Sequence, residues 1–186
     1  FNRRKFITIH NGIDINKFKK SSQSRSIFRK KLNINSNETL YGTVARFNPI
    51  KDHNTLIKSI FLLKKTGFKF KYLLIGKNIN NKNKTLKNLI NKYKLEEIMI
   101  LIEEEKNVAL VMNALDLHIL SSKSEALPMV VLEAMACGLP IITTKECGSL
   151  VEDKKDGLLI PIRDPIAIAN AIIKIVENRA LRDKMS

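Results

Sequence analysis

Short apolar segments alternate with helix-like segments along most of this 186-residue chain. Apolar residues recur at helical spacing in the longer segments, whereas the shorter ones are apolar almost throughout. The strands are expected at residues 40–46, 71–76, 98–102, 117–120, 141–144 and 158–162. The helices are expected at 55–65, 84–94, 106–115, 129–136 and 165–177. Strands that are apolar on both faces are typical of a parallel sheet covered by helices on both sides, so the sequence predicts an α/β fold with three α/β/α layers and a mostly parallel sheet.

The first 39 residues are less regular than the rest. They contain a strand-like run at 6–10 and a basic, helix-like run at 25–32. We interpret residues 1–39 as an interdomain connector with the first elements, and residues 40–186 as one domain. Because the chain begins with Phe1 and ends within a helical pattern, we expect it to be part of a longer protein.

Length and composition narrow the class of protein. A chain of this length can bury a sizeable core. No apolar run reaches the ~18 residues that a membrane-spanning helix needs, and no signal peptide is recognisable. Cys137 and Cys147 have no metal-like spacing, and we interpret them as reduced, small apolar residues of a cytoplasmic protein.

The net charge of +15 is unevenly distributed. Residues 1–40 carry ten basic and two acidic side chains, residues 77–94 carry six lysines and no acid, and residues 95–144 are acidic overall. This pattern favours attraction to an anionic partner such as a phosphate group or a membrane surface. Aromatic residues make up only 6% of the chain and no nucleic-acid-binding motif is present, so a nucleic-acid partner is not expected.

Two glutamates, Glu125 and Glu133, lie beside the end of a predicted central strand and are separated by seven residues. Ligands of parallel sheets bind outside the carboxyl ends of the strands. Ionised carboxylates accept strong hydrogen bonds from neighbouring hydroxyl groups, which suits a sugar. The alternative is a solvated loop acid and a surface helix acid. Glu133, however, interrupts the apolar run MVVLEAMA and therefore needs either exposure or a partner.

Arg46 and Lys51 flank the loop that leaves another predicted strand. A guanidinium group and an ammonium group together suit a diphosphate. The alternative is that both residues are ordinary surface cations in a basic chain. The helix predicted at 129–136 would add the free N–H groups of its first turn. The chain has no dinucleotide fingerprint and no P-loop, and its three histidines are far apart in the sequence, so neither a cofactor nor a metal site is expected.

Four segments in order resemble the retaining GT-B glycosyltransferases of family 4 and its relatives. They are IHNGIDINKF (9–18), VARFNPIKDHNTLIKSI (44–60), SSKSEALPMVVLEAMACGLPIIT (121–143), and GSLVEDKKDGLLIPIRDPIAIANAI (148–172) with its Gly148 and Glu152. The resemblance implies a Rossmann-like domain, the C-terminal donor-binding half of a GT-B fold, without the N-terminal acceptor domain. It implies transfer of a sugar from a UDP- or GDP-linked donor, with no metal required, in the synthesis of a surface polysaccharide, lipopolysaccharide or glycolipid.

The resemblance also implies a role for each matching residue. Arg46 and Lys51 would hold the donor diphosphate and stabilise the leaving charge, Glu125 would contact the transferred sugar, and Glu133 would bind the ribose. The loop after Ile102 would frame the base. The sugar and phosphates would also contact Ala126, Leu127, Pro128, Met129 and Val130.

The chain departs from the family pattern at several positions. Glycine is usual in the family where this chain has Ala45, Asp52, Asn78 and Ala126, and Cys147 replaces the first glycine of a pair. Two other functions remain open: a non-catalytic module that binds anions or membranes through its basic segments, and a GT-B-like sugar-nucleotide epimerase. For the enzyme we expect a cytoplasmic location, with peripheral attachment to the inner face of the membrane.

Overall fold

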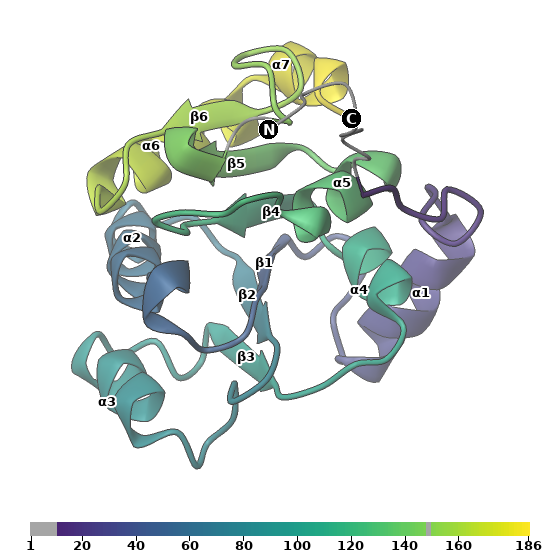
Figure 1. Cartoon of the computed structure of the whole chain (residues 1–186). Helices are drawn as coiled ribbons and strands as arrows, with labels where there is room; N and C mark the ends of the chain where they lie inside the picture. Colours follow the sequence, from purple (N-terminus) through teal and green to yellow (C-terminus); the bar gives the residue numbers. More distant parts are fainter. Residues whose placement is uncertain (1–10, 148–149) are drawn as a thin grey trace, which may run out of the picture.

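The computed structural model describes residues 11–147 and 150–186, which contain a six-stranded parallel sheet (Figure 1). The order of the strands is β3-β2-β1-β4-β5-β6. The strands are β1 (Leu40–Val44), β2 (Lys71–Ile75), β3 (Met99–Ile102), β4 (Leu117–Leu120), β5 (Ile141–Thr144) and β6 (Leu158–Ile160). The predicted α/β class and parallel sheet are thus confirmed, and the strand order is that of a Rossmann fold.

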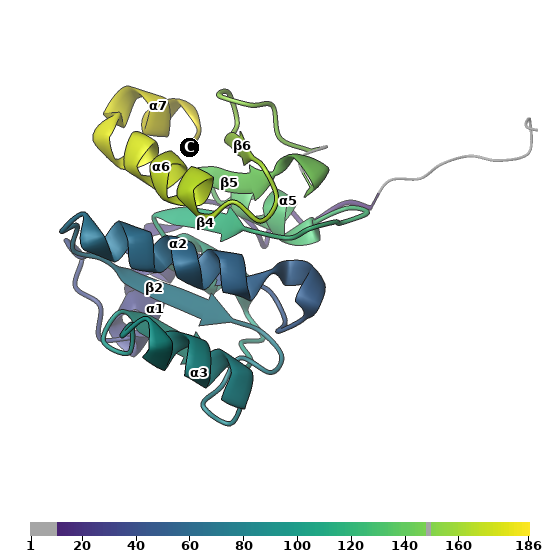
Figure 2. The same ribbon diagram turned by 90° about the vertical axis from the view of Figure 1, so that its left-hand side faces the viewer.

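Helices cover both faces of the sheet. One face carries α2 (His53–Lys65), α3 (Lys84–Lys92) and α6 (Pro165–Glu177), which lie together in Figure 2. The other carries α1 (Ser22–Lys31), α4 (Val108–Ala114) and α5 (Met129–Ala136).

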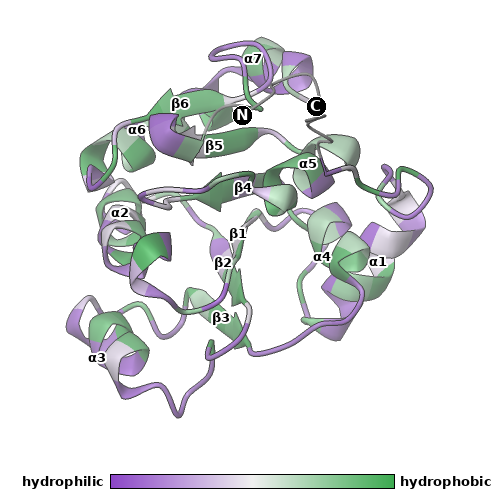
Figure 3. Ribbon diagram, viewed as in Figure 1, coloured by the Kyte–Doolittle hydropathy of each residue, from purple (hydrophilic) through white to green (hydrophobic). Residues whose placement is uncertain are grey.

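Side chains alternate between the two cores along each strand. In β2, Tyr72 and Leu74 pack under α2 and α3, whereas Leu73 and Ile75 face α4. In Figure 3 the strands are accordingly apolar over most of their length. The predicted three layers are therefore present, with one apolar core on each side of the sheet.

The bounds of the elements differ from the sequence prediction mainly near the ends of the chain. Helix α1 begins earlier than predicted because the Ser21 hydroxyl accepts a hydrogen bond from Ser24 N–H. A further helix, α7 (Arg179–Lys184), starts where the Asn178 side chain accepts from Leu181 N–H. Short 3₁₀ turns occur at Pro49–Lys51 and Lys145–Cys147. The strand predicted at 6–10 lies outside the described residues.

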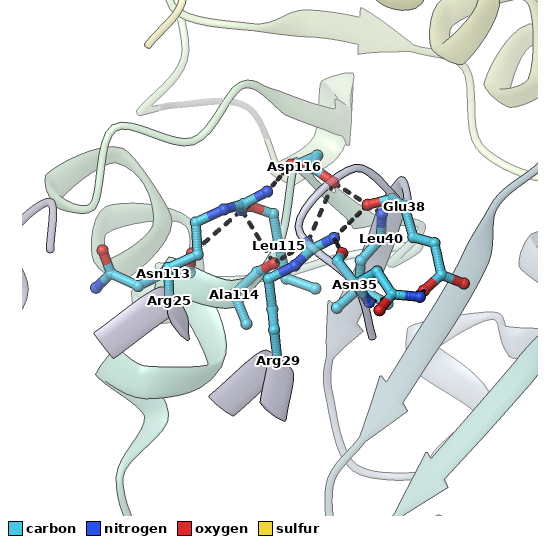
Figure 4. A network of polar contacts seen from close by, with 9 residues as sticks. All are labelled: Arg25, Arg29, Asn35, Glu38, Leu40, Asn113, Ala114, Leu115 and Asp116. Atoms are coloured by element: carbon cyan, nitrogen blue, oxygen red, sulfur yellow. Dashed lines mark hydrogen bonds and ion pairs between the residues drawn. The ribbon is translucent and has the colours of Figure 1, made fainter. Parts of the chain in front are cut away.

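Two arginines join α1 to the rest of the domain (Figure 4). Arg29 is only 3% exposed and donates to the backbone carbonyls of Ala114, Asn35 and Glu38. Arg25 pairs with Asp116, whose other carboxylate oxygen accepts from Leu40 N–H at 2.8 Å. The end of α4, the start of β1 and helix α1 therefore share one network of charge-assisted hydrogen bonds.

Replacing Arg29 by methionine should lower the free energy of unfolding by about 3 kcal/mol, because three backbone carbonyls lose a buried, charged donor. The neighbouring Lys30 is exposed, so Lys30→Met is the matched control and should be nearly neutral. Urea denaturation of both variants measures the difference. Equal stabilities would show that the network does not hold α1 in place.

Candidate functional site

The order of the strands reverses between β1 and β4, and a cavity opens at the carboxyl ends of these two strands. In sheets of this kind the reversal leaves a crevice in which ligands bind. The cavity has a volume of about 650 Å³. Its lining comes from the segments that follow β1 and β4: Val44, Ala45, Arg46, Asn48, Ile50, Lys51, Ser124, Glu125, Ala126, Leu127, Pro128, Met129 and Val130. Eight of the nine site residues predicted from the sequence therefore lie around one cavity.

The loop 48–52 carries Lys51 into this cavity. Asn48 begins its 3₁₀ turn by accepting a hydrogen bond from Ile50 N–H at 2.9 Å. Asp52 ends the turn in the left-handed conformation, with φ of 48°, and its carboxylate accepts from the Thr55 hydroxyl at the start of α2. Aspartate tolerates this conformation better than most residues do, so it can occupy a position at which the resemblance led us to expect glycine.

Asn78 is a second position at which the resemblance led us to expect glycine. Asn78 also adopts a left-handed conformation, with φ of 66°, and asparagine is tolerated there. The preceding Gly76 cannot be replaced so easily, because a Cβ atom on it would lie 2.4 Å from the carbonyl oxygen of Ala45. The backbones that follow β1 and β2 thus approach each other closely at Ala45 and Gly76. Only glycine, which has no Cβ atom, permits this contact at position 76.

Lys51 and Glu125 form an ion pair across the cavity, between the Lys51 ammonium and Glu125 Oε1. Their side chains are 16% and 17% exposed, so water screens this pair less than a surface pair. The Arg46 side chain is exposed and makes no ion pair with any described residue. The cavity therefore holds two cations and one carboxylate.

Helix α5 begins at the cavity without a side-chain cap. The residue before it is Pro128, which offers no side-chain hydrogen bond to the first turn. Met129 and Val130 belong to this first turn and line the cavity. Free N–H groups and the positive end of the helix dipole favour an anion or a hydroxyl oxygen at this position.

Glu133 is the predicted site residue that does not line the cavity. It lies one turn beyond Val130 on α5 and is partly buried. Burial raises the pKa of the Glu133 carboxyl, and the nearby Lys17 ammonium acts in the opposite direction. Of the glycine–glutamate element predicted at the end of β5, Gly148 lies outside the described residues, and Glu152 forms an exposed pair with Lys155.

Asn48, Ile50 and Ser124 also line the cavity, although the sequence analysis did not select them. Each lies one or two positions along the chain from a predicted site residue, so their positions in the same two loops were the available signal. Groups of three or more metal-ligating side chains do not occur among residues 11–147 and 150–186. No helix in these ranges is long and apolar enough to cross a bilayer.

The fold and the cavity together define a class of protein, the GT-B glycosyltransferases, whose solved structures share this parallel sheet. The sequence model of the family described as "Glycosyl transferases group 1" matches residues 24–186. The chain belongs to this family.

Similar proteins agree with this assignment. The chain is 30% identical over 140 residues to the putative colanic acid biosynthesis glycosyltransferase WcaL of Escherichia coli strain K12, covering 70% of this chain and 34% of that protein. It is 26% identical over 180 residues to N-acetyl-alpha-D-glucosaminyl L-malate synthase of Bacillus anthracis, covering 96% and 46%. The chain therefore spans less than half the length of these curated relatives.

The structure resembles that of Anabaena Alr3699/HepE in complex with UDP and glucose. The TM-score is 0.85 at 27% sequence identity, and the likeness covers 95% of this chain and 49% of that one. The C-terminal domain of a group 1 glycosyl transferase from Francisella tularensis, LpcC, has the same fold, with a TM-score of 0.79 at 21% identity over 94% of this chain and 92% of that one.

Two buried histidines close to Lys51 predict a loss of stability in weak acid. Burial, assisted by the Lys51 ammonium, lowers the pKa of His118 to about 3 and that of His53 to about 4. Unfolded histidine titrates near pH 6.5, so between these values the unfolded chain binds protons that the folded chain does not. Stability is therefore complete above about pH 6.5 and falls below it, by about 2 kcal/mol per histidine at about pH 5.

The variant His118→Gln keeps an acceptor for Val44 N–H, which lies 3.4 Å from His118 Nε2, but it does not titrate. Urea denaturation at about pH 7.5 and pH 5 should therefore show roughly half of the acid-induced loss in this variant. An unchanged loss would contradict the role of His118.

Proposed function

We propose that the cavity between β1 and β4 binds the diphosphate and sugar of a nucleotide-sugar donor, and that the domain supports transfer of this sugar to an acceptor. The observation that carries the proposal is the convergence of Arg46, Lys51, Glu125 and the first turn of α5 on one cavity. Two cations and N–H donors suit a diphosphate, and a carboxylate suits the hydroxyl groups of a sugar.

The HepE structures support this choice of ligand. HepE has been crystallised with UDP, with UDP-glucose, and with UDP and glucose. The HepE chain is 27% identical to this one, and the two share their fold over 95% of this chain and 49% of HepE. By similarity, we propose a uridine- or guanosine-linked donor for this chain, with a hexosyl group as the sugar.

Arg46 and Lys51 would assist the reaction by stabilising charge. When the bond between the sugar and the diphosphate breaks, negative charge develops on the leaving diphosphate, and two fixed cations lower the energy of that state. The Glu125 carboxylate would accept hydrogen bonds from the sugar hydroxyls. Glu133, one turn deeper along α5, would bind the ribose. We propose that the transferred sugar keeps its anomeric configuration.

The acceptor would be bound by a further domain that faces this cavity. We propose a role in the synthesis of a polysaccharide, lipopolysaccharide or glycolipid, as the names of several relatives suggest. We further propose a cytoplasmic location with peripheral attachment to an anionic membrane, supported by the lysine-rich helix α3 and the basic helix α1. Binding to anionic vesicles that weakens with added salt would test this attachment.

Calorimetric titration of the chain with UDP, GDP and ADP tests the binding of a donor. One of the nucleotides should bind, and Lys51→Met should weaken its affinity at least tenfold, because a charge-assisted contact to phosphate is lost. Arg46→Ala should act in the same direction. Lys69→Met is the matched control, because Lys69 is exposed. It precedes β2 and so lies at the amino-terminal end of the strands, whereas the cavity lies at their carboxyl ends.

Equal affinities of the Lys51→Met and Lys69→Met variants would refute the diphosphate site. The variant Glu133→Ala separates the ribose contact from the phosphate contacts. It should weaken the binding of a nucleoside diphosphate but leave the binding of inorganic pyrophosphate unchanged.

Metal ions should not be needed for this binding. Arg46 and Lys51 supply the positive charge that a divalent cation would otherwise bring to the diphosphate. Titrations with EDTA and with Mg²⁺ should therefore give the same affinity for the nucleotide. A loss of affinity in EDTA would mean that the two cations are insufficient.

A further inference from the structure

The segment that follows β4 holds the loop 48–52 at several points of its backbone. The Ser121 hydroxyl donates to the Lys51 carbonyl at 2.8 Å and lies 3.4 Å from that of Asp52. Lys123 N–H donates to the Ile50 carbonyl at 2.7 Å, and its ammonium donates to the Pro49 carbonyl at 3.0 Å. We call Ser121 and Lys123 the loop clamp.

The geometry of the loop explains why it needs such contacts. A single 3₁₀ turn leaves its carbonyls without partners inside the turn, and three of these carbonyls accept from the loop clamp. The turn ends at Asp52 in a left-handed conformation that residues other than glycine adopt reluctantly. The Lys123 ammonium also lies 4.0 Å from the Asp52 carboxylate, which is only 7% exposed.

We propose that Ser121 and Lys123 are positioning residues that fix the backbone of Lys51, so that its ammonium faces the cavity. This inference rests on the proposed function of the cavity as a diphosphate site. The side chain of lysine is long and flexible, so its ammonium is placed well only if its backbone is held. Glu125 then holds the ammonium itself, and it comes from the same segment as the loop clamp.

The chain offers a matched control for Ser121 at the next position. Ser121 and Ser122 are 1% and 0% exposed, and each loses only a hydroxyl group on substitution by alanine. The Ser122 hydroxyl has no hydrogen-bond partner within the described part of the chain. A general effect of removing a buried hydroxyl would therefore appear in both variants, whereas a positioning effect would appear only in Ser121→Ala.

The experiment measures the affinity for UDP, with GDP in parallel, by NMR titration, which also reports weak binding. Ser121→Ala and Ser122→Ala are each made in the native chain and in the Lys51→Met chain. In the native chain, Ser121→Ala should weaken nucleotide binding about three- to tenfold, and Ser122→Ala should not. In the Lys51→Met chain, Ser121→Ala should have no further effect, because there is no ammonium left to position.

Each other outcome overturns a defined part of the inference. Equal losses in both backgrounds would show that Ser121 acts through the fold as a whole. If Ser121→Ala does not weaken nucleotide binding in the native chain although Lys51→Met does, the positioning role is refuted and the diphosphate site stands. An undiminished affinity of Lys51→Met would refute the diphosphate site and the positioning role with it.

Lys123 provides a second test that does not alter a fully buried residue, since its side chain is 33% exposed. Lys123→Met should weaken nucleotide binding, and Lys123→Arg should restore it, because arginine can still donate to the Pro49 carbonyl. The loss should again disappear in the Lys51→Met background. Equal affinities of the methionine and arginine variants would show that the Lys123 side chain does not position the loop.

Discussion

The divergence of β1 from β4 is the constraint on which the rest of the site depends. These strands pair only at Tyr41–Leu117 and Gly42–His118, whereas β1 and β2 pair over five residues. Beyond Gly42, the Val44 N–H is directed to the side chain of His118 instead of the backbone of β4. The two strands therefore separate toward their carboxyl ends, and the segments that follow them form opposite walls of a cavity.

The charges within this cavity differ from those of the molecule as a whole. The chain carries a net charge of +15, but the cavity contains two cations and one carboxylate, and two of these three groups already form an ion pair. Under the proposed function, the donor diphosphate would compete with Glu125 for Lys51, and Glu125 would then be free to accept from the sugar hydroxyls. In the structure, the ion pair holds the Lys51 ammonium and the Glu125 carboxylate close together inside the cavity.

Particular residues show how far the sequence could predict this structure. Helix α5 and strand β5 have the bounds that were predicted, because Pro128, Gly138 and the apolar run between them are strong local signals. Arg46, Lys51 and Glu125 line one cavity, since parallel strands bring the loops that follow them to one end of the sheet. Glu133 shows what the sequence could not predict. Its distance from Glu125 along the chain did not reveal that it lies outside the lining of the cavity.

The sequence by itself determined the alternation of strands and helices, the parallel sheet between two apolar cores, and the membership of a family. These properties follow from local periodicity and from ordered motifs, which do not require knowledge of distant contacts. Only the tertiary structure decided that Lys51 pairs with Glu125, that Asp52 and Asn78 adopt left-handed conformations, and that the Ser121 hydroxyl donates to the Lys51 carbonyl. The two contacts of Lys51 join residues about 70 positions apart, and their geometry depends on the point at which β1 and β4 separate.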